Sequence, residues 1–321
     1  MPSLPKASVI IVNWNGLKLL PDCLSSLRAQ TVKDFEIILV DNGSADGSAA
    51  YVKENYPSVR LLEAGENLGF AKGNNVGAKA AEGDVLVLLN NDTAVEPDWL
   101  EKLLAPLERD PSIGAAGSKL IYFDDKEEIN SVGTFVSVLG FSGSVGDGMP
   151  RAAYAAEQEV FAACGGALAI RRKLYLEVGG LYEPFFMYED DVDLGWKVWN
   201  AGLRVVLAPD SIVYHKYSRT QKPYKYYFMT RNKLWCAWKN ARTRDLLFLM
   251  PASVAFSKAL FLAFLCTLKF ENAKQVARGL IDGLKSLPAR EPARNSLASR
   301  HYLGVRDSLA AAFRKSGKHF S

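Results

Sequence analysis

The chain has 321 residues, of which 49% are hydrophobic and 23% charged, so its composition is that of a globular protein and excludes a disordered one. This length can bury a large core and allows one or two domains. The four cysteines are widely spaced without a CxxC pair, which excludes a cysteine-based zinc pattern and a disulfide framework and favours a reducing compartment. We expect no signal peptide, because the first six residues run directly into an apolar segment.

The formal net charge of +4 conceals an uneven distribution of charge along the chain. Residues 1–221 hold 20 basic and 30 acidic residues, a net charge of −10, whereas residues 222–321 hold 19 basic and 5 acidic residues, a net charge of +14. This asymmetry predicts two parts, an acidic domain over 1–221 and a basic, apolar-rich helical tail over 222–321. The basic part favours an anionic partner, either a phospholipid surface or nucleic acid, and the alternative is a solvated basic helix bundle.

Strands and helices are predicted to alternate in the first ninety residues. Buried strands are predicted at residues 7–12, 35–40, 59–62 and 85–89, and helices at 17–30, 49–54 and from 67 to 81. The resulting order, β-α-β-α-β-α-β, predicts an α/β fold with a mostly parallel, doubly wound sheet and right-handed crossovers.

Polar side chains follow several of these strands. The fourth strand ends in Asn90, Asn91 and Asp92, the first in Asn13, and the second in Asp41 and Asn42. One Asp after a strand is most often a turn former or a helix cap. Several such positions indicate a site, because ligands bind at the carboxyl ends of the strands in open α/β sheets.

The middle of the chain gives a weaker pattern. A helix is predicted at 99–107, a strand at 113–120, a strand with a Gly-Gly kink at 160–170, helices at 171–178 and from an acidic run near 190 to 201, and short strands at 204–207 and 212–214. Five glycines between 124 and 158 predict a long loop over a site. His215 lies just after the last predicted strand.

The tail contains a 23-residue apolar stretch, residues 246–268, which is long enough to span a bilayer. Pro251 and Lys258 interrupt it, and a central Lys costs about 2.5–3.5 kcal/mol on insertion scales. A helix in the membrane interface, or a hairpin dipping into it, therefore fits better, and the basic amphipathic segment 269–285 supports an interfacial location. The alternative is a soluble helical cap over the sheet.

Asp41, Asp92 and Asp191 each lie at a strand end or at a helix start. Clustered carboxylates repel one another unless a cation lies among them, and Asp with His suits Mg²⁺ or Mn²⁺, which in turn suits a diphosphate. The chain has no GxxxxGK[ST] motif, and no GxGxxG follows the first strand, so phosphates would be held by metal and side chains. These residues predict a nucleoside diphosphate that carries a transferable group.

Six segments in this order, VIIVNWNG, LVDNGSADGS, ENLGFAKGNN, LLNNDT, GGALAIRR and YEDDVDL, resemble glycosyltransferase family 2, the inverting enzymes of the GT-A fold. The match is best to the rhamnosyltransferase-like branch, which builds bacterial surface polysaccharides, and it covers about residues 6–220. The resemblance implies a GT-A nucleotide-sugar-binding and catalytic domain over 1–221. The C-terminal helical, membrane-associating region over 222–321 is expected from its composition.

The resemblance also implies roles for single residues. The residues implied to bind the sugar nucleotide are Asn13, Asn15, Asp41, Asn42, Gly69, Phe70, Asn74 and Asn91. Asp92 would be the metal-binding carboxylate of the family's DxD motif, which reads Asn90-Asn91-Asp92 here, and His215 would complete the metal sphere or touch the phosphates.

Asp191 would be the catalytic base, with Asp190 beside it as a second candidate catalytic residue. It would take the proton from an acceptor hydroxyl as that oxygen attacks the anomeric carbon, and one displacement inverts the configuration. The neighbouring carboxylates Glu189, Asp190 and Asp193 are expected to raise its basicity. The alternative is an acidic helix start, favourable at the helix dipole.

The predicted function is a metal-dependent inverting transferase that moves a sugar, with rhamnose as one candidate, from a dTDP- or UDP-linked donor to a hydroxyl of a lipid-linked or polysaccharide acceptor in cell-surface glycan synthesis. Its expected place is the cytoplasm, peripherally on the inner face of the cell membrane, with an anionic membrane surface but no nucleic acid as partner. One alternative, a nucleotidyltransferase, would need a Gly-rich basic loop after the first strand, where Asn13-Trp14-Asn15-Gly16 stands. Another is a non-catalytic glycan- or nucleic-acid-binding protein, which the acids around Asp191 disfavour.

Overall fold

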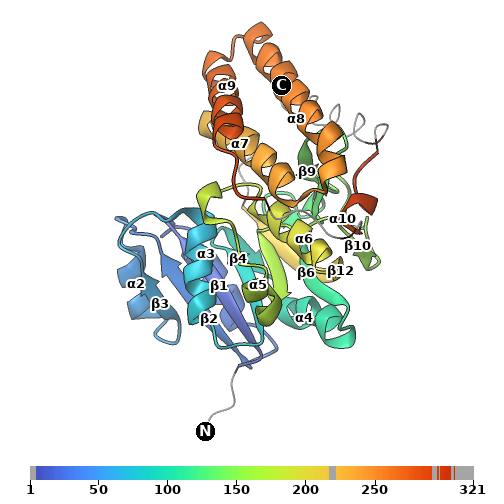
Figure 1. The fold of residues 1–321 in the computed structure, drawn as a ribbon. Helices are drawn as coiled ribbons and strands as arrows, with labels where there is room; N and C mark the ends of the chain where they lie inside the picture. The colour runs from blue at the N-terminus through green and yellow to red at the C-terminus, as the bar shows by residue number, and fades with distance from the viewer. Residues whose placement is uncertain (1–4, 217–221, 291–294, 296, 305–306, 308–321) are drawn as a thin grey trace.

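The computed structural model describes residues 5–216, 222–290, 295, 297–304 and 307 (Figure 1). Its strands are β1 (Ala7–Asn13), β2 (Phe35–Asp41), β3 (Arg60–Glu63), β4 (Val85–Asn90), β5 (Thr93–Val95), β6 (Ile113–Tyr122), β7 (Ile129–Ser131), β8 (Thr134–Val136), β9 (Ser142–Ser144), β10 (Gln158–Glu159), β11 (Ala167–Arg171) and β12 (Arg204–His215). Its α-helices are α1 (Leu20–Arg28), α2 (Ser48–Asn55), α3 (Gly69–Ala80), α4 (Trp99–Arg109), α5 (Arg172–Glu177), α6 (Asp190–Asn200), α7 (Pro223–Asn240), α8 (Thr243–Cys266), α9 (Phe270–Lys285) and α10 (Leu297–Arg300).

The predicted alternation of strands and helices in the first ninety residues is confirmed, and β1 lies between β2 and β4 with both pairs parallel. Alternate residues of β1 face opposite sides of the sheet because side chains alternate along a strand. Val9 and Ile11 pack in the cluster that contains α1 and α4, whereas Ile10 packs in the cluster that contains α3 and α6. All three are fully buried, which explains the continuous apolar run from Val9 to Val12.

The other half of the sheet makes it mixed. The strand order is β10-β12-β6-β11-β4-β1-β2-β3, with β5 on β12 and β7 on β6. β11 pairs antiparallel with both β4 and β6, whereas β12 pairs parallel with β6. The insertion of β11 beside β4 brings the segment that precedes β11 to the end of the sheet where β4 finishes.

Three parts of the middle region differ from the sequence prediction. Segment 124–158 is not a long loop, since it contains β7, β8 and β9 and reaches the start of β10; Gly143 lies within β9, whereas Gly140 (φ 75°) and Gly146 (φ 80°) lie between strands. The strand predicted at 160–170 is shorter, because only Ala167–Arg171 pairs with β4 and β6. The two short strands predicted after 204 form one strand, β12, with an irregularity between Ala208 and Ile212.

The helices α7, α8 and α9 stand above the sheet in Figure 1, and the apolar stretch 246–268 lies mostly within α8. α9 packs closely on α7, since a Cβ added at Gly279 would lie 2.5 Å from the carbonyl oxygen of Tyr227. α7 is also fixed to α6, because Oδ1 of Asp193 on α6 lies 3.4 Å from Nζ of Lys239 and 2.6 Å from Nδ2 of Asn240, both on α7.

Candidate active site

The ends of β1, β2 and β4 form a connected polar network. The parallel register places Asn13 opposite Asp41, and Asn90 opposite Val12. Nδ2 of Asn13 donates to Oδ1 of Asp41 at 3.2 Å, and Nδ2 of Asn91 donates to Oδ1 of Asn13 at 2.8 Å. Three residues that are far apart in the sequence therefore meet at one edge of the sheet, as the sequence predicted.

The same network fixes the loops beyond these strands. The backbone N–H of Ser44 donates to Oδ2 of Asp41 at 2.9 Å, and that of Ala45 donates to Oδ1 of Asn15 at 2.8 Å. Nδ2 of Asn42 donates to the carbonyl oxygen of Gly69 at 3.0 Å, which joins the end of β2 to the start of α3. These bonds hold the loops after β1 and β2 in one arrangement before any ligand binds.

The remaining predicted donor residues lie on α3. Gly69 has φ 76°, and its carbonyl is held by Asn42 as described above. The side chain of Asn74 is buried and donates to the carbonyl oxygen of Phe70 at 2.9 Å, so it supports its own helix. The ring of Phe70 reaches toward Gly165, where an added Cβ would lie 3.7 Å from Cζ of that ring.

Asp92 and His215 lie side by side although 123 positions separate them in the chain. The antiparallel pairing of β5 with β12 places Thr93 opposite His215. Nε2 of His215 lies 3.2 Å from Oδ1 of Asp92, and Nδ1 lies 2.8 Å from Oδ1 of Asn130 on β7. Burial would raise the pKa of Asp92, but the hydrogen bond and charge of His215 outweigh it and hold this pKa below its usual range.

Asp191 lies in the first turn of α6 with its carboxylate held by three donors. Oδ2 accepts from the N–H of Gly165 at 3.1 Å and from the hydroxyl of Thr134 at 3.4 Å, and Oδ1 accepts from the N–H of Val192 at 2.9 Å. Burial raises the pKa of Asp191 above its usual value of 3.8, although these donors oppose the shift. The main cause is thus burial and not the neighbouring carboxylates that the sequence had suggested.

The four acids near the start of α6 have different surroundings. Asp193 is buried among Lys197, Lys239 and Asn240, and their attraction outweighs burial and lowers its pKa. Burial and the charge of Asp191 raise the pKa of Asp190 well above its usual value. Glu189 accepts a 2.5 Å hydrogen bond from Ser142. Among these acids, Asp191 is the one that binds the N–H of Gly165, before β11.

The segment Cys164, Gly165 and Gly166 connects the two carboxylate sites. The N–H of Gly165 binds Asp191, and the carbonyl of Gly166 accepts from the N–H of Asn90 at 3.0 Å. Burial raises the pKa of the Cys164 thiol to about 12, and the nearby charges of Asp191 and, more weakly, Asp92 add to the shift. Asp92, Asp191 and His215 are therefore gathered around one region at the end of β4.

Sequence analysis missed three residues of this region, namely Thr134, Asn130 and Gly165. Thr134 and Asn130 lie in the segment that was predicted to be a loop, where no periodic pattern marked them. The Gly-Gly pair at 165 and 166 was the available signal. This pair predicts a kink within a strand. In the structure it lies directly before β11, and the backbone N–H of Gly165 donates to Asp191.

Among the residues that the structure describes, no group of three or more His, Cys, Asp or Glu side chains is arranged to hold a metal ion. Asp92 and His215 supply one carboxylate and one imidazole. Mg²⁺ typically takes one or two carboxylates and completes its sphere with phosphate oxygens and water. The pair therefore fits a cation that is bound together with a diphosphate, and not a metal site built from protein ligands alone.

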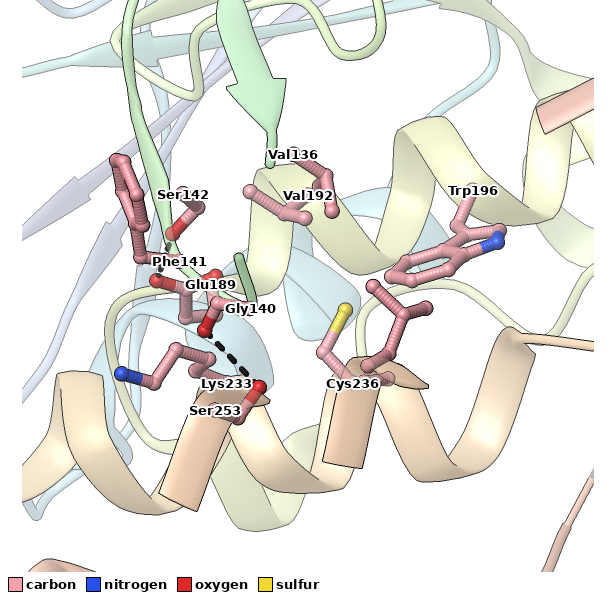
Figure 2. Close-up of a pocket in the computed structure, with 12 residues that line it drawn as sticks. Val136, Gly140, Phe141, Ser142, Glu189, Val192, Trp196, Lys233, Cys236 and Ser253 are labelled. Carbon is pink, nitrogen blue, oxygen red and sulfur yellow. Dashed lines mark hydrogen bonds between the residues drawn. The ribbon is translucent and has the colours of Figure 1, made fainter. Parts of the chain in front are cut away.

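A small cavity of about 20 Å³ lies on the other side of the start of α6, between α6, α7, α8 and the turn before β9 (Figure 2). Glu189, directly before α6, and Val192 of α6 line it on one side, and Lys233 and Cys236 line it from α7. Its volume suffices for about one water molecule, so it holds no sugar.

Comparison with known proteins gives a family match and two informative relatives. Residues 8–179 match the family Glycosyl transferase family 2. The chain is 32% identical over 230 residues to the N-acetylglucosaminyl-diphospho-decaprenol L-rhamnosyltransferase of Mycobacterium tuberculosis, covering 64% of this chain and 75% of that protein. It is 29% identical over 229 residues to the O-antigen biosynthesis protein RfbC of Myxococcus xanthus, covering 68% of this chain but only 18% of that protein.

Two solved structures share the fold. The S. aureus protein TarS, residues 1–349, matches with a TM-score of 0.61 and 18% identity, covering 88% of this chain and 81% of that one. The mannosyltransferase PcManGT of Pyrobaculum calidifontis, in complex with GDP-Man and Mn²⁺, matches with a TM-score of 0.54 and 16% identity, covering 88% of each chain. At these identities the likeness shows the fold alone, which is the GT-A fold.

We predict that Gly69→Ala destabilises the protein more than Gly65→Ala does. Both glycines have a positive φ, 76° and 75°, so the backbone strain of the new side chain is similar. A Cβ at Gly69 would lie 2.5 Å from the carbonyl oxygen of Phe186, whereas none of the described atoms lies within 4 Å of a Cβ at Gly65. Denaturant unfolding should give Gly69→Ala an extra loss of about 1–3 kcal/mol. Equal losses would contradict the tight contact.

Proposed function

Because the chain belongs to glycosyl transferase family 2 and is a glycosyltransferase of the GT-A fold, we propose that it transfers a sugar from a nucleoside diphosphate to an acceptor hydroxyl with inversion. Family membership decides against the nucleotidyltransferase and against the non-catalytic binding protein. The observation that carries the proposal is the position of Asp191, a partly buried carboxylate with a raised pKa beside Gly165, next to the network of β1, β2 and β4.

Asp191 acts as the general base in this proposal. Oδ1 and Oδ2 are held by backbone N–H groups, so the carboxylate has a fixed orientation before the acceptor arrives. It takes the hydroxyl proton while the acceptor oxygen forms its bond to the anomeric carbon and the bond to the diphosphate breaks. The diphosphate departs as an anion, so no acid of the kind a glycoside hydrolase needs is required. Burial and the charge of Asp191 raise the pKa of Asp190 well above its usual value, which disfavours a second negative charge beside Asp191.

The donor is proposed to lie along the polar network. Asn13, Asn15, Asp41 and Asn42 would contact the nucleoside, with Asn91 beside them, and Gly69, Phe70 and Asn74 would shape the wall on α3. Asp92 and His215 would hold Mg²⁺ or Mn²⁺, which supplies neutralisation of the diphosphate charge. Asn130 supports this assignment, because its contact with Nδ1 fixes the ring of His215 and directs Nε2 toward Asp92.

The substrates follow from the relatives. The mycobacterial relative is named as an L-rhamnosyltransferase acting on N-acetylglucosaminyl-diphospho-decaprenol. We extend this to a dTDP- or UDP-linked donor, with rhamnose as the leading sugar, and to a lipid-linked or polysaccharide acceptor in cell-surface glycan synthesis. The chain spans only part of the Myxococcus relative, so these substrates are proposals for this chain.

We also propose that residues 1–221 bind the donor and catalyse transfer, while residues 222–321 rest on the cytoplasmic face of an anionic membrane. In the described part of the chain, α8 is the helix long and apolar enough to cross a membrane, and only 17% of its most apolar 18 residues are buried. Near the turn between α8 and α9, far from the sheet in Figure 1, Leu262, Leu268 and Phe270 are 57%, 73% and 62% exposed. Lys269 and Lys274 are exposed beside them, which favours anionic lipid.

Replacing Asp191 by Asn should abolish transfer while donor binding survives. We expect kcat to fall by about 10²–10⁴-fold because the base is lost. In the unsubstituted protein, activity should rise with pH through an apparent pKa above 3.8, because burial raises the pKa of Asp191 and only the carboxylate accepts the proton. Asp84→Asn, at an exposed carboxylate before β4, is the control and should stay active. Full activity of Asp191→Asn would remove Asp191 as the base.

Metal binding should depend on both Asp92 and the diphosphate. We expect Mn²⁺, followed by electron paramagnetic resonance, to bind more tightly when UDP or dTDP is present, because Asp92 and His215 supply two ligands and the phosphate oxygens would add further ones. Asp92→Ala should weaken this binding by at least about tenfold, whereas Glu82→Ala, at the opposite end of β4, should not. Excess chelator should stop turnover. Unchanged rates in chelator would make Asp92 a structural residue.

Sedimentation with vesicles tests the membrane proposal. The protein should bind vesicles that contain phosphatidylglycerol and not vesicles of phosphatidylcholine alone, and binding should weaken as salt rises. The double variant Leu268→Asp, Phe270→Asp should lower partitioning by about tenfold or more, since each side chain contributes when buried in lipid. Leu176→Asp, at an apolar residue of α5 that is 48% exposed, is the matched control. Equal binding of all three proteins would reject this surface.

A further inference from the structure

The segment that leads into α6 has an unusual backbone. Phe186, Tyr188 and Glu189 all have φ 66°, a left-handed conformation that non-glycine residues rarely adopt. Three such residues within four positions do not keep this shape unless their surroundings enforce it. Asp191 follows two residues later, so the conformation of this segment decides where the proposed base lies.

Asn232, on α7, is the residue that enforces this shape most directly. Its side chain is fully buried, and its Nδ2 donates to the carbonyl oxygens of Phe185, Met187 and Tyr188 at 3.0, 2.8 and 2.9 Å. An amide nitrogen carries only two hydrogens, so the three acceptors share them. One side chain thus satisfies the carbonyls on both sides of the left-handed residue Phe186.

Arg231 fixes the orientation of that amide. Its Nε donates to Oδ1 of Asn232 at 2.9 Å, which directs Nδ2 toward the carbonyls. Its Nη2 also donates to the carbonyl oxygens of Pro184 and Phe185 at 2.8 and 3.1 Å. The guanidinium lies 4.3 Å from the ring centroid of Trp235, which holds it in place.

Aromatic contacts follow the same face of α7. Phe228, Asn232 and Trp235 are spaced by four and three residues, so they lie on one side of the helix. The ring of Phe186 stacks on Phe228 with centroids 5.6 Å apart, and Phe185 stacks on Trp235 at 6.3 Å. The carbonyl of Phe186 in turn accepts from the N–H of Phe70 at 2.7 Å, so the segment also contacts the start of α3.

We propose that Asn232 is a positioning residue for sugar transfer: by binding the carbonyls of residues 185, 187 and 188 it holds the left-handed segment that sets the place of Asp191. This inference rests on the proposed function, in which Asp191 is the base. It makes the first helix after the α/β region part of the catalytic apparatus, although Asn232 itself touches no reacting atom.

The test compares Asn232→Leu with Asn240→Leu. Leu resembles Asn in size but donates no hydrogen bond. Asn240 lies on the same helix, is equally buried, and donates to Asp193 and to Cys236, but not to residues 185–188. We expect kcat of Asn232→Leu to fall on the order of 100-fold, as for a displacement of about 1 Å at a reacting group. The dissociation constants of UDP and dTDP, measured by calorimetry, should change by less than about threefold. Asn240→Leu should keep a kcat near that of the unsubstituted protein.

A double-mutant cycle separates positioning from general destabilisation. If Asn232 acts through Asp191, adding Asn232→Leu to Asp191→Asn should cause little further loss of kcat, because residues that act as a unit are not additive. Losses of kcat that multiply in the double variant, or equal losses of kcat in Asn232→Leu and Asn240→Leu, would overturn the proposal.

If Asn232→Leu does not fold, as judged by circular dichroism, Asn232→Ser replaces it. Its single hydroxyl donor should give a loss of kcat smaller than the roughly 100-fold expected for Asn232→Leu. Normal kcat in the Asn232 variants, with Asp191→Asn inactive, would reject the positioning role alone, whereas an active Asp191→Asn would reject the proposed base.

Discussion

The parallel alignment of β1 with β2 and β4 is the constraint on which the site depends. Once Asn13 stands opposite Asp41, and Asn90 opposite Val12, the polar residues that follow these strands must share one edge of the sheet. Hydrogen bonds among Asn13, Asp41 and Asn91 then fix these side chains relative to one another. The antiparallel pairing of β5 with β12 adds His215 to Asp92 at the same edge. Ligand-binding chemistry here is thus a consequence of strand register.

Burial gives adjacent carboxylates different chemistry. Asp191 and Asp193 lie two positions apart on α6, and Asp193 is fully buried whereas Asp191 is partly buried. Asp193 meets two ammonium groups, which lower its pKa, so its charge serves to join α6 to α7. The hydrogen-bond donors of Asp191 carry no charge, so burial prevails and raises its pKa. The residue type is the same, and the surroundings decide between a structural ion pair and a base.

Much of this arrangement could be predicted from sequence, because it follows from local patterns. The strands that carry Asn13, Asp41 and Asp92 are apolar on both faces, and order along the chain sets their topology. Thr134 and Gly165 could not be found in this way, because they approach Asp191 through the packing of β8 and the insertion of β11, and neither feature has a periodic signal. The sequence also could not predict that the pKa values of Asp190 and Asp191 are raised and that of Asp193 is lowered, since these shifts depend on residues from α7 and from the segment before β11.

The same reasoning changes how the C-terminal helices are understood. Their composition, basic and apolar, separates them from the acidic α/β region, and the sequence therefore suggested an appended tail. The contacts of α7 are instead those of an internal helix: Lys239 and Asn240 bind Asp193, and Asn232 binds the segment before α6. Removing one partner of a buried polar or charged pair strongly destabilises a protein, because the other partner is left buried without its hydrogen bond. The boundary predicted from charge, between residues 221 and 222, thus falls before α7, the helix on which the geometry of Asp191 depends. The exposed apolar residues near the turn between α8 and α9 lie farther from Asp191.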